Sequence, residues 1–167
     1  TAAQVIQTMV DRTVTSLDAA GVPVDDRERI LTIASIIQRE ARIADDFYKV
    51  SRVIQNRLDI GMRLEMDSTA QYGVDEASGS VWSSAEALGS VNAWNTYQRD
   101  GLPVGPIASP GDVAIDAAMN PVEGSWIFFV TVNLNTGETV FSNTIAEHDA
   151  AVAQLRSWCR DNPDSGC

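Results

Sequence analysis

A single carboxylic acid, placed near the end of an apolar helical pattern, is the residue of this sequence best suited to acid chemistry. Between residues 29 and 43, apolar side chains recur at the three-and-four spacing of one helix face. Glu40 lies three residues after Ile37 and seven after Ile33, so we expect it on or beside that face. Burial and the negative end of the helix dipole both raise the pKa of a carboxyl group. A carboxyl group that stays protonated in this way can donate a proton to a substrate.

Glu40 also has an ordinary structural interpretation. Arg39 and Arg42 lie close to it in the chain, and a solvated glutamate at a helix end can pair with either arginine. Structural ion pairs shift pKa values as well, so the helical pattern by itself leaves both roles open.

The order of the predicted elements indicates an α+β fold in a single domain, residues 1–167. We expect a mainly helical domain with a long loop-rich segment and a C-terminal β-hairpin, and a lysozyme-like placement of the acid at a helix end. Helices are predicted at 2–20, within 29–43, at 47–58, from Ser109 and Pro110 (as N-cap and first turn) to 119, and from Thr144 to about 158. The loop-rich segment is 67–111, and the hairpin strands are 126–132 and 138–142.

The loop-rich segment carries aromatic rings and amides among few charges. Rings stack on the C–H faces of sugars, while amide groups bond to pairs of hydroxyls, so this composition suits a neutral glycan. The residues in question are Gln71, Tyr72, Trp82, Asn92, Trp94, Asn95, Thr96 and Tyr97. Anchoring of the loop to the core is the alternative for the tryptophans.

Charge and residue types exclude several other functions. Twelve basic against 23 acidic residues give a net charge of −11, which argues against a nucleic-acid partner. One histidine and two cysteines lack zinc-ligand spacing, and no calcium-loop pattern is present, so we expect no metal and no cofactor. His148 has no serine or cysteine nucleophile motif beside it, and a lone histidine is more often structural.

The two cysteines lie at the C-terminal end. A turn-rich run of seven residues separates Cys159 from Cys167, so a disulfide between them is possible sterically, as are two free thiols. A bridge would indicate an oxidising compartment. No apolar run is long enough for a membrane span. Because the chain begins with Thr1 rather than Met, we expect a piece of a longer protein, with any membrane anchor upstream.

A protonated carboxyl group beside a sugar-binding wall suggests cleavage of a glycosidic bond. Glycoside hydrolases usually add a second carboxylate, for which Asp67 is the best candidate, although Ser68 and Thr69 after it favour a turn or N-cap role. One acid is enough if the substrate supplies its own nucleophile.

Several short motifs, in order along the chain, resemble those of the YceG-like endolytic murein transglycosylases, the MltG family. They are Ala34–Glu40, Val53–Leu58 with Gly61–Leu64, Asp67–Thr69 with Tyr72–Gly73, Asn95–Tyr97, Gly101–Ile107, Pro110–Gly111, Phe141–Thr144 and Glu147–His148. Many relatives carry Glu at the position of Gln38, so here Glu40 is the acid that can serve. Ser109 and Asp149 stand where the family often has Asn.

The resemblance implies Glu40 as the catalytic residue of a lytic transglycosylase. Such an enzyme cleaves the β-1,4 bond between N-acetylmuramic acid and N-acetylglucosamine in nascent peptidoglycan and leaves 1,6-anhydro-muramyl ends, which terminates strand elongation. The candidate glycan-binding residues are Thr69, Tyr72, Asn95, Thr96, Tyr97, Asn143 and His148. A lysozyme-like hydrolase and a non-catalytic wall-binding module remain the alternatives.

The family also implies a location and partners. We expect the extracytoplasmic face of the bacterial membrane or the cell wall, peptidoglycan as substrate and cell-wall synthases as candidate partners. The family's LysM-like region and membrane helix have no counterpart in this chain, so contact with a membrane would depend on an anchor upstream.

Overall fold

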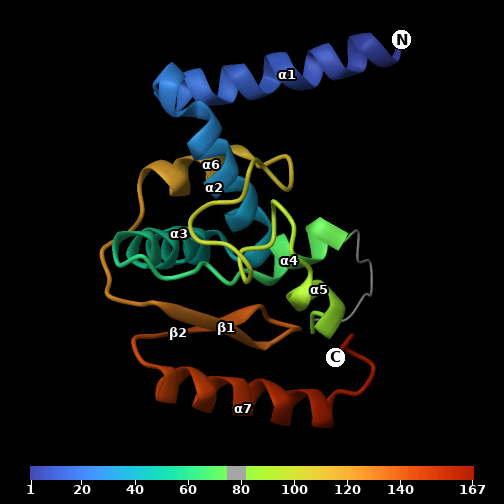
Figure 1. Cartoon of the computed structure of the whole chain (residues 1–167), viewed down its shortest axis with the longest axis vertical. Helices are drawn as coiled ribbons and strands as arrows, with labels where there is room; N and C mark the ends of the chain where they lie inside the picture. The colour runs from blue at the N-terminus through green and yellow to red at the C-terminus, as the bar shows by residue number, and fades with distance from the viewer. Residues whose placement is uncertain (75–81) are drawn as a thin grey trace.

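The chain folds into a helical body that rests on a C-terminal hairpin, with the last helix beneath the hairpin (Figure 1). The computed structural model describes residues 1–74 and 82–167, and the statements below concern these residues. The elements are α1 (Ala2–Ala19), a 3-10 helix (Val24–Asp26), α2 (Arg27–Glu40), α3 (Ala44–Asp59), α4 (Asp67–Val74), α5 (Ala85–Gly89), α6 (Asp112–Met119), β1 (Phe128–Asn133), β2 (Glu138–Ser142) and α7 (Ile145–Asp161). The predicted α+β fold, mainly helical with a C-terminal hairpin, is confirmed.

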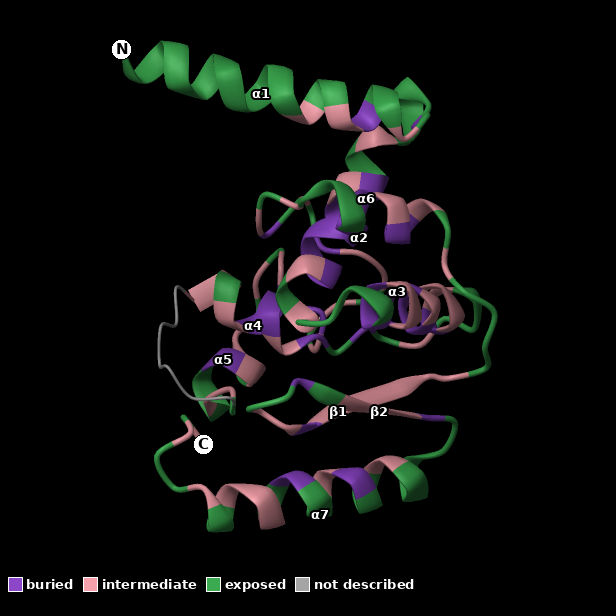
Figure 2. Ribbon diagram, turned by 180° about the vertical axis from the view of Figure 1, so that it is seen from behind, coloured by how far each residue is buried: buried purple, intermediate pink, exposed green. Residues whose placement is uncertain are grey.

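The helix that carries Glu40 is the centre of the body. Residues 32–37 of α2 are all buried, so the helix is covered on every side rather than along one stripe (Figure 2). The side chains of Ile33, Ile36 and Ile37 have no exposed surface. Helices α3, α4 and α6 pack around them, because an all-round apolar surface requires neighbours on all sides.

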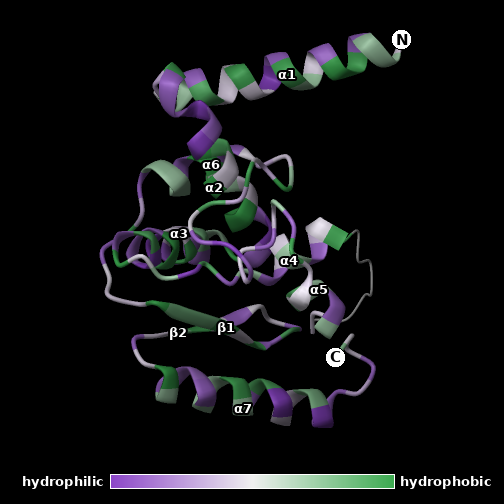
Figure 3. Cartoon of the chain, viewed as in Figure 1, coloured by the Kyte–Doolittle hydropathy of each residue, from purple (hydrophilic) through white to green (hydrophobic). Residues whose placement is uncertain are grey.

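Helix α1 has the predicted position in the chain but a different environment. Thr1 and Gln4 form a capping box at its start, and Leu17 near its end is its buried residue. The apolar side chains of its first half lie in solvent, with Val5 61% and Ile6 62% exposed. Figures 1 and 3 show α1 extending away from the body, with apolar and polar residues mixed along it. The apolar pattern therefore predicted the helix correctly, but the helix adds little to the core.

The hairpin and α7 form a layer of their own on one side of the body. Strands β1 and β2 pair antiparallel, with Phe128 opposite Ser142, and Gly137 takes a left-handed conformation (φ 77°) in the turn between them. Helix α7 packs on both strands. The predicted capping box at its start is present: Thr144 accepts a hydrogen bond from the Glu147 N–H, and Glu147 accepts one in return.

Helix α6 begins later than predicted. The sequence suggested Ser109 as the N-cap, whereas the N-cap is Gly111, in an extended conformation, and the helix starts at Asp112. The backbone N–H of Gly111 donates to the side chain of Gln38 on α2 at 3.0 Å. This contact with a distant residue determines where the helix starts, and local spacing cannot show it.

The C-terminal segment is closed by a disulfide between Cys159 and Cys167, whose Cα atoms are 5.8 Å apart. Of the two alternatives left open by the spacing, the structure has the bridge. No helix in the described ranges has the length and apolar character needed to cross a membrane.

A buried amide holds much of the loop-rich segment together. The Asn95 side chain is fully buried, and its nitrogen donates to the backbone carbonyls of Ala87 (2.9 Å), Leu88 (3.3 Å) and Ser90 (2.7 Å). Its oxygen accepts from the backbone N–H of Tyr97 at 3.0 Å. The Asn95 amide therefore supplies a hydrogen-bond partner to each of four backbone groups.

We expect Asn95→Ala to lower the free energy of unfolding by about 3 kcal/mol, because buried carbonyl groups lose their donor and a cavity remains. Asn120→Ala is the matched control: Asn120 is exposed and its amide makes one side-chain bond, so the loss should stay below about 1 kcal/mol. Urea denaturation followed by circular dichroism measures both. Equal losses in the two variants would contradict the structural role of Asn95.

Candidate active site

Glu40 is the last residue of α2, and its carboxyl group meets the first turn of α4. Its Oε1 accepts two hydrogen bonds from Ser68, one from the backbone N–H at 3.1 Å and one from the hydroxyl at 2.5 Å. The structural alternative, an ion pair with a neighbouring arginine, is absent among the described residues: neither Arg39 nor Arg42 pairs with Glu40. The carboxyl group is thus held by neutral donors.

Burial is the main influence on the acidity of Glu40. It raises the pKa of this carboxyl group above its ordinary value of 4.5, against the opposing effect of the two Ser68 hydrogen bonds. The negative charge of Asp67 raises the pKa further, and Arg39 lowers it. Because Ser68 directs two donors to Oε1, a proton on the carboxyl group belongs on Oε2. Glu40 therefore has the properties of a general acid with one defined proton-bearing oxygen.

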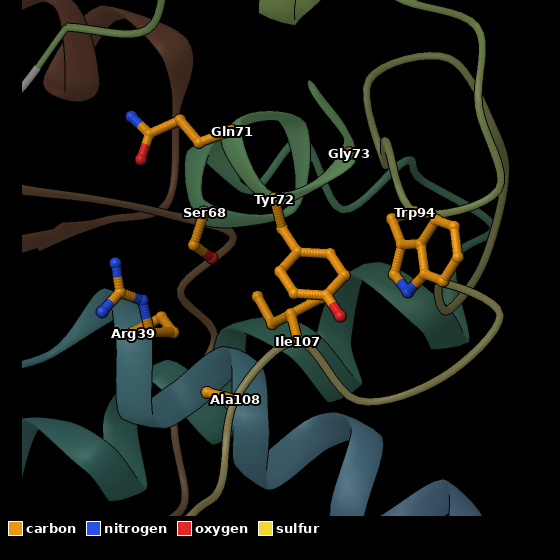
Figure 4. Close-up of a pocket in the computed structure, with 8 residues that line it drawn as sticks. All are labelled: Arg39, Ser68, Gln71, Tyr72, Gly73, Trp94, Ile107 and Ala108. Carbon is orange, nitrogen blue, oxygen red and sulfur yellow. The ribbon is translucent and has the colours of Figure 1, made fainter. Parts of the chain in front are cut away.

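Two cavities meet at this acid. The first, of about 510 Å³, lies between α2, α4 and the 107–108 loop. Figure 4 shows its lining residues, with Arg39 at the end of α2 and Ser68 and Gln71 on α4. The second, of about 600 Å³, contains Glu40 and extends under the hairpin and α7. Arg39, Ser68 and Gln71 line both, so the two cavities adjoin beside Glu40, which lines the second.

The second cavity holds two further carboxylates. Asp67, the predicted candidate for a second acid, accepts a hydrogen bond from the hydroxyl of Tyr97. Glu65 is exposed in the same cavity and has a left-handed backbone (φ 47°), which is uncommon for a residue other than glycine. Burial and the charge of Asp67 raise the pKa of Tyr97, so its hydroxyl remains a donor.

A buried cation joins the hairpin to the body at this cavity. Arg57 of α3 is 6% exposed and donates to the backbone carbonyls of Leu64 (2.5 Å) and Ile127 (2.6 Å). Its guanidinium also lies over the ring of Phe128, 5.3 Å from the ring centre. Burial lowers the pKa of Arg57, while the charges of nearby acids, among them Glu65, raise it. The contacts with Ile127 and Phe128 fix the start of β1 against the end of α3, and the bond to Leu64 holds the loop that follows α3.

His148 completes the far wall of the second cavity. Its ring stacks on Phe128 with 5.3 Å between centres, and its Nδ1 is buried without a hydrogen-bond partner among the described residues. Burial and the charge of Arg57 lower the pKa of His148, which favours the neutral ring at pH 7.

Three of the predicted glycan contacts lie inside the protein. Thr69, Asn95 and Thr96 have no exposed surface, and none of them lines either cavity. The hydroxyls of Thr69 and Thr96 bond to each other at 2.8 Å, and Thr96 accepts from the backbone N–H of Met66 at 3.0 Å. In this structure Thr69 and Thr96 support the start of α4, and Asn95 holds the loop around α5, so none of the three lines the cleft.

The other predicted residues divide between the cleft and the surface. Tyr72 is 49% exposed in the first cavity, with its ring 5.7 Å from that of Trp94, while Tyr97 and His148 line the second. Asn143 lies outside both cavities: its backbone N–H donates to the Glu147 carboxylate at 2.8 Å, as part of the cap of α7.

Two residues of α2 tie a distant loop to the first cavity. The hydroxyl of Ser35 accepts from the backbone N–H of Ile107 at 3.0 Å, and Gln38 accepts from that of Gly111. Ile107 and Ala108 form part of the cavity wall. The helix that presents the acid therefore also positions the opposite wall.

Sequence reasoning missed Ser68, Arg57 and Glu65 as parts of the site. In the sequence Ser68 serves only to favour a turn or N-cap role for Asp67, although its place in the motif Asp67–Thr69 is a usable signal. Arg57 belongs to the motif Val53–Leu58, but nothing local in the sequence shows that its side chain reaches the hairpin. In the described ranges no cluster of three or more His, Cys, Asp or Glu side chains is suited to holding a metal ion.

With this geometry in view, comparison with known proteins places the chain. A model described as the YceG-like family matches residues 1–154. The chain belongs to the YceG-like family. A crystal structure of a YceG-like protein from Listeria monocytogenes matches with a TM-score of 0.70 and 32% identity, over 84% of this chain and 44% of that one.

Two curated relatives of this chain are named endolytic murein transglycosylase. The protein from Bacillus subtilis (strain 168) is 34% identical over 123 residues, which are 74% of this chain and 33% of that protein. The protein from Streptococcus pneumoniae (serotype 2, strain D39) is 27% identical over 128 residues, 75% of this chain and 23% of that protein. The chain thus spans about a quarter to a third of the length of these relatives.

The stability of the Glu40→Gln variant tests the acidity of the site. Below pH 4.5 Glu40 is protonated in both the folded and the unfolded protein. Above that pH the unfolded state loses the proton, while the raised pKa keeps it on the folded state, so the wild type loses stability. The variant, which cannot ionise, should gain about 1.4 kcal/mol over the wild type for each pH unit until the folded-state pKa is reached.

Urea unfolding of both proteins at several values between pH 4 and pH 8 measures this difference. A difference that stays constant over the range would show that the pKa of Glu40 is not raised by folding.

Proposed function

We propose that this chain is a peptidoglycan lytic transglycosylase, which cleaves the β-1,4 bond between N-acetylmuramic acid and N-acetylglucosamine within glycan strands. The observation that carries the proposal is the acid Glu40, whose pKa burial raises and whose carboxyl group Ser68 holds where two cavities adjoin. Two adjoining cavities beside the acid suit a strand that continues in both directions from the scissile bond. The names of the relatives support the same substrate.

The reaction begins with Oε2 of protonated Glu40 donating its proton to the glycosidic oxygen. The bond between this oxygen and muramyl C1 breaks with its electron pair on the oxygen, and an oxocarbenium-like centre develops at C1. The carboxylate of Glu40 then takes the proton from the muramyl C6 hydroxyl, whose oxygen closes on C1. The products are a new N-acetylglucosamine end and a 1,6-anhydro-muramyl end, and Glu40 is protonated again.

Each part of the site has a role in this scheme. The Ser68 hydrogen bonds hold Oε1 so that Oε2 faces the substrate, and they stabilise the carboxylate formed midway. Tyr72 and Trp94 offer ring faces to sugars in the first cavity, and Phe128 and His148 form an aromatic wall in the second.

Hydrolysis is the second candidate, because Asp67 and Glu65 line the same cavity as Glu40. Either carboxylate can in principle activate a water or attack C1, as the second acid of a glycoside hydrolase does. The product would then be an ordinary reducing end.

We also propose an extracytoplasmic location, at the membrane or in the cell wall, with cell-wall synthases as candidate partners. The Cys159–Cys167 disulfide supports an oxidising compartment.

Digestion of uncrosslinked glycan strands followed by mass spectrometry of the ends tests the reaction. We expect ends lighter than the hydrated muramyl sugar by one water, and a loss of at least about a thousandfold in rate for Glu40→Gln, because the acid takes part in both proton transfers. Asp67→Asn is the matched control, since Asn still accepts from Tyr97, and it should retain most activity.

The other outcomes select among the alternatives. Reducing ends from the wild type, lost in Asp67→Asn or Glu65→Gln, would replace the transglycosylase by a hydrolase. Unchanged activity in Glu40→Gln would remove Glu40 from the reaction. Binding of strands without cleavage would indicate a wall-binding module.

A further inference from the structure

Arg39 is a cation without a counter-ion in a strongly acidic protein. The chain has 23 acidic and 12 basic residues, so most basic side chains find a partner. Among the described residues, Arg39 and Arg160 are the basic side chains that have no hydrogen bond, ion pair or ring contact. Arg160 is exposed in the last turn of α7, away from both cavities.

The position of Arg39 differs from that of Arg160 in one respect that matters for binding. It is exposed, yet it lines both cavities, directly before Glu40 in the chain and across from Ser68 and Gln71 (Figure 4). Its charge acts on the carboxyl group of Glu40 without forming an ion pair. All its donors are therefore free in the part of the cleft where the reacting sugar would lie.

We propose that Arg39 binds a carboxylate carried on the 3-O-lactyl arm of a muramyl residue next to the scissile bond, and so selects muramyl-containing glycans over neutral ones. The proposal deepens the function proposed above and rests on it. A planar guanidinium bonds a carboxylate through two parallel N–H groups, a geometry that a neutral sugar hydroxyl cannot match.

The chemistry of the substrate supplies such a group. Among the two alternating sugars of peptidoglycan, only the muramyl residue bears the lactyl arm. Its carboxyl group is free where the peptide stem has been removed. Where the stem is present, that carboxyl group is an amide and the stem carries carboxylates of its own. Both sources present a carboxylate that is joined to the muramyl residue through the lactyl arm, directly in the first case and through the stem in the second.

The other groups in the cleft agree with this role. Glu40, Glu65 and Asp67 give the second cavity an acidic side, and the whole chain is acidic, so an anionic strand needs a local positive charge to enter. Arg57 is the other arginine in that cavity, but its donors are directed to backbone carbonyls. Arg39 is thus the cation that remains available to the substrate.

Binding to the Glu40→Gln protein, measured by titration calorimetry, tests the proposal without cleavage. The ligands are glycan strands with peptide stems, the same strands after an amidase has freed the lactyl carboxylates, and N-acetylglucosamine oligomers, which have no lactyl arm. We expect Arg39→Gln to weaken binding of at least one carboxylate-bearing ligand about tenfold and to leave the neutral oligomers unchanged. Arg39→Lys should lose less, because it keeps the charge.

Arg160→Gln is the matched control, since it removes the same charge from an unpaired arginine outside the cleft, and it should bind all three ligands as the parent does. Loss with the amidase-treated strands alone assigns the free lactyl carboxylate, and loss with the stem-bearing strands alone assigns the stem. Four outcomes overturn the proposal. In the first two, Arg39→Gln weakens binding of the neutral oligomers equally, or changes the binding of no ligand. In the others, Arg160→Gln has a similar effect, or no carboxylate-bearing glycan binds at all.

A kinetic comparison of the wild type with Arg39→Gln, both of which keep Glu40, separates substrate recognition from an effect of Arg39 on the pKa of Glu40. Removal of the Arg39 charge raises the pKa of Glu40, which changes kcat and its pH profile alike for every substrate. Recognition instead raises KM for carboxylate-bearing strands only. If the wild type cleaves nothing, the proposed reaction fails, whereas the binding experiment still decides the role of Arg39.

Discussion

The complete enclosure of residues 32–37 in α2 is the constraint on which the rest of the structure depends. Six consecutive residues, 32–37, are buried, so neighbours must cover the helix on all sides. Its last residue, Glu40, then emerges into a space bounded by protein and reached through the cavities. Burial raises the pKa of that carboxyl group, and this one consequence of packing makes the acid available for proton transfer.

The short motifs that identify the family are joined mainly by hydrogen bonds from one motif to another. Ser35 and Gln38 of α2 anchor the 107–111 loop through its backbone N–H groups, and Ser68 of α4 anchors Glu40. Asn95 and Thr96 supply buried polar partners to the surrounding backbone. Buried polar groups of this kind are costly unless each has its partner, so the motifs depend on one another across the chain. The hydrogen bonds of Ser35, Gln38 and Ser68 lie around the cleft.

The hairpin and α7 contribute the second half of the cleft without joining the helical core. Arg57 connects them to the body through backbone carbonyls and the Phe128 ring. The result is a second cavity with an aromatic wall on one side and the acids on the other. Arg39, between this cavity and the first, is the charge left unpaired where a substrate would pass.

The sequence by itself determined helices α1, α2, α3, α6 and α7, the hairpin, the capping box of α7 and the position of Glu40 near a helix end, because these follow from local spacing and from groups a few residues apart. The short helices α4 and α5 lie in the segment predicted as loop-rich. It also supported the family through its motifs. Only the tertiary structure decided which polar residues face the cleft. Thr69, Asn95 and Thr96 have side chains as polar as those of Tyr72 and Tyr97, yet they are buried and bond to other protein groups. Likewise, the apolar face of α1 looks like a core face but lies in solvent. Burial depends on which segments pack together in space, and the local spacing of residues does not indicate those distant partners.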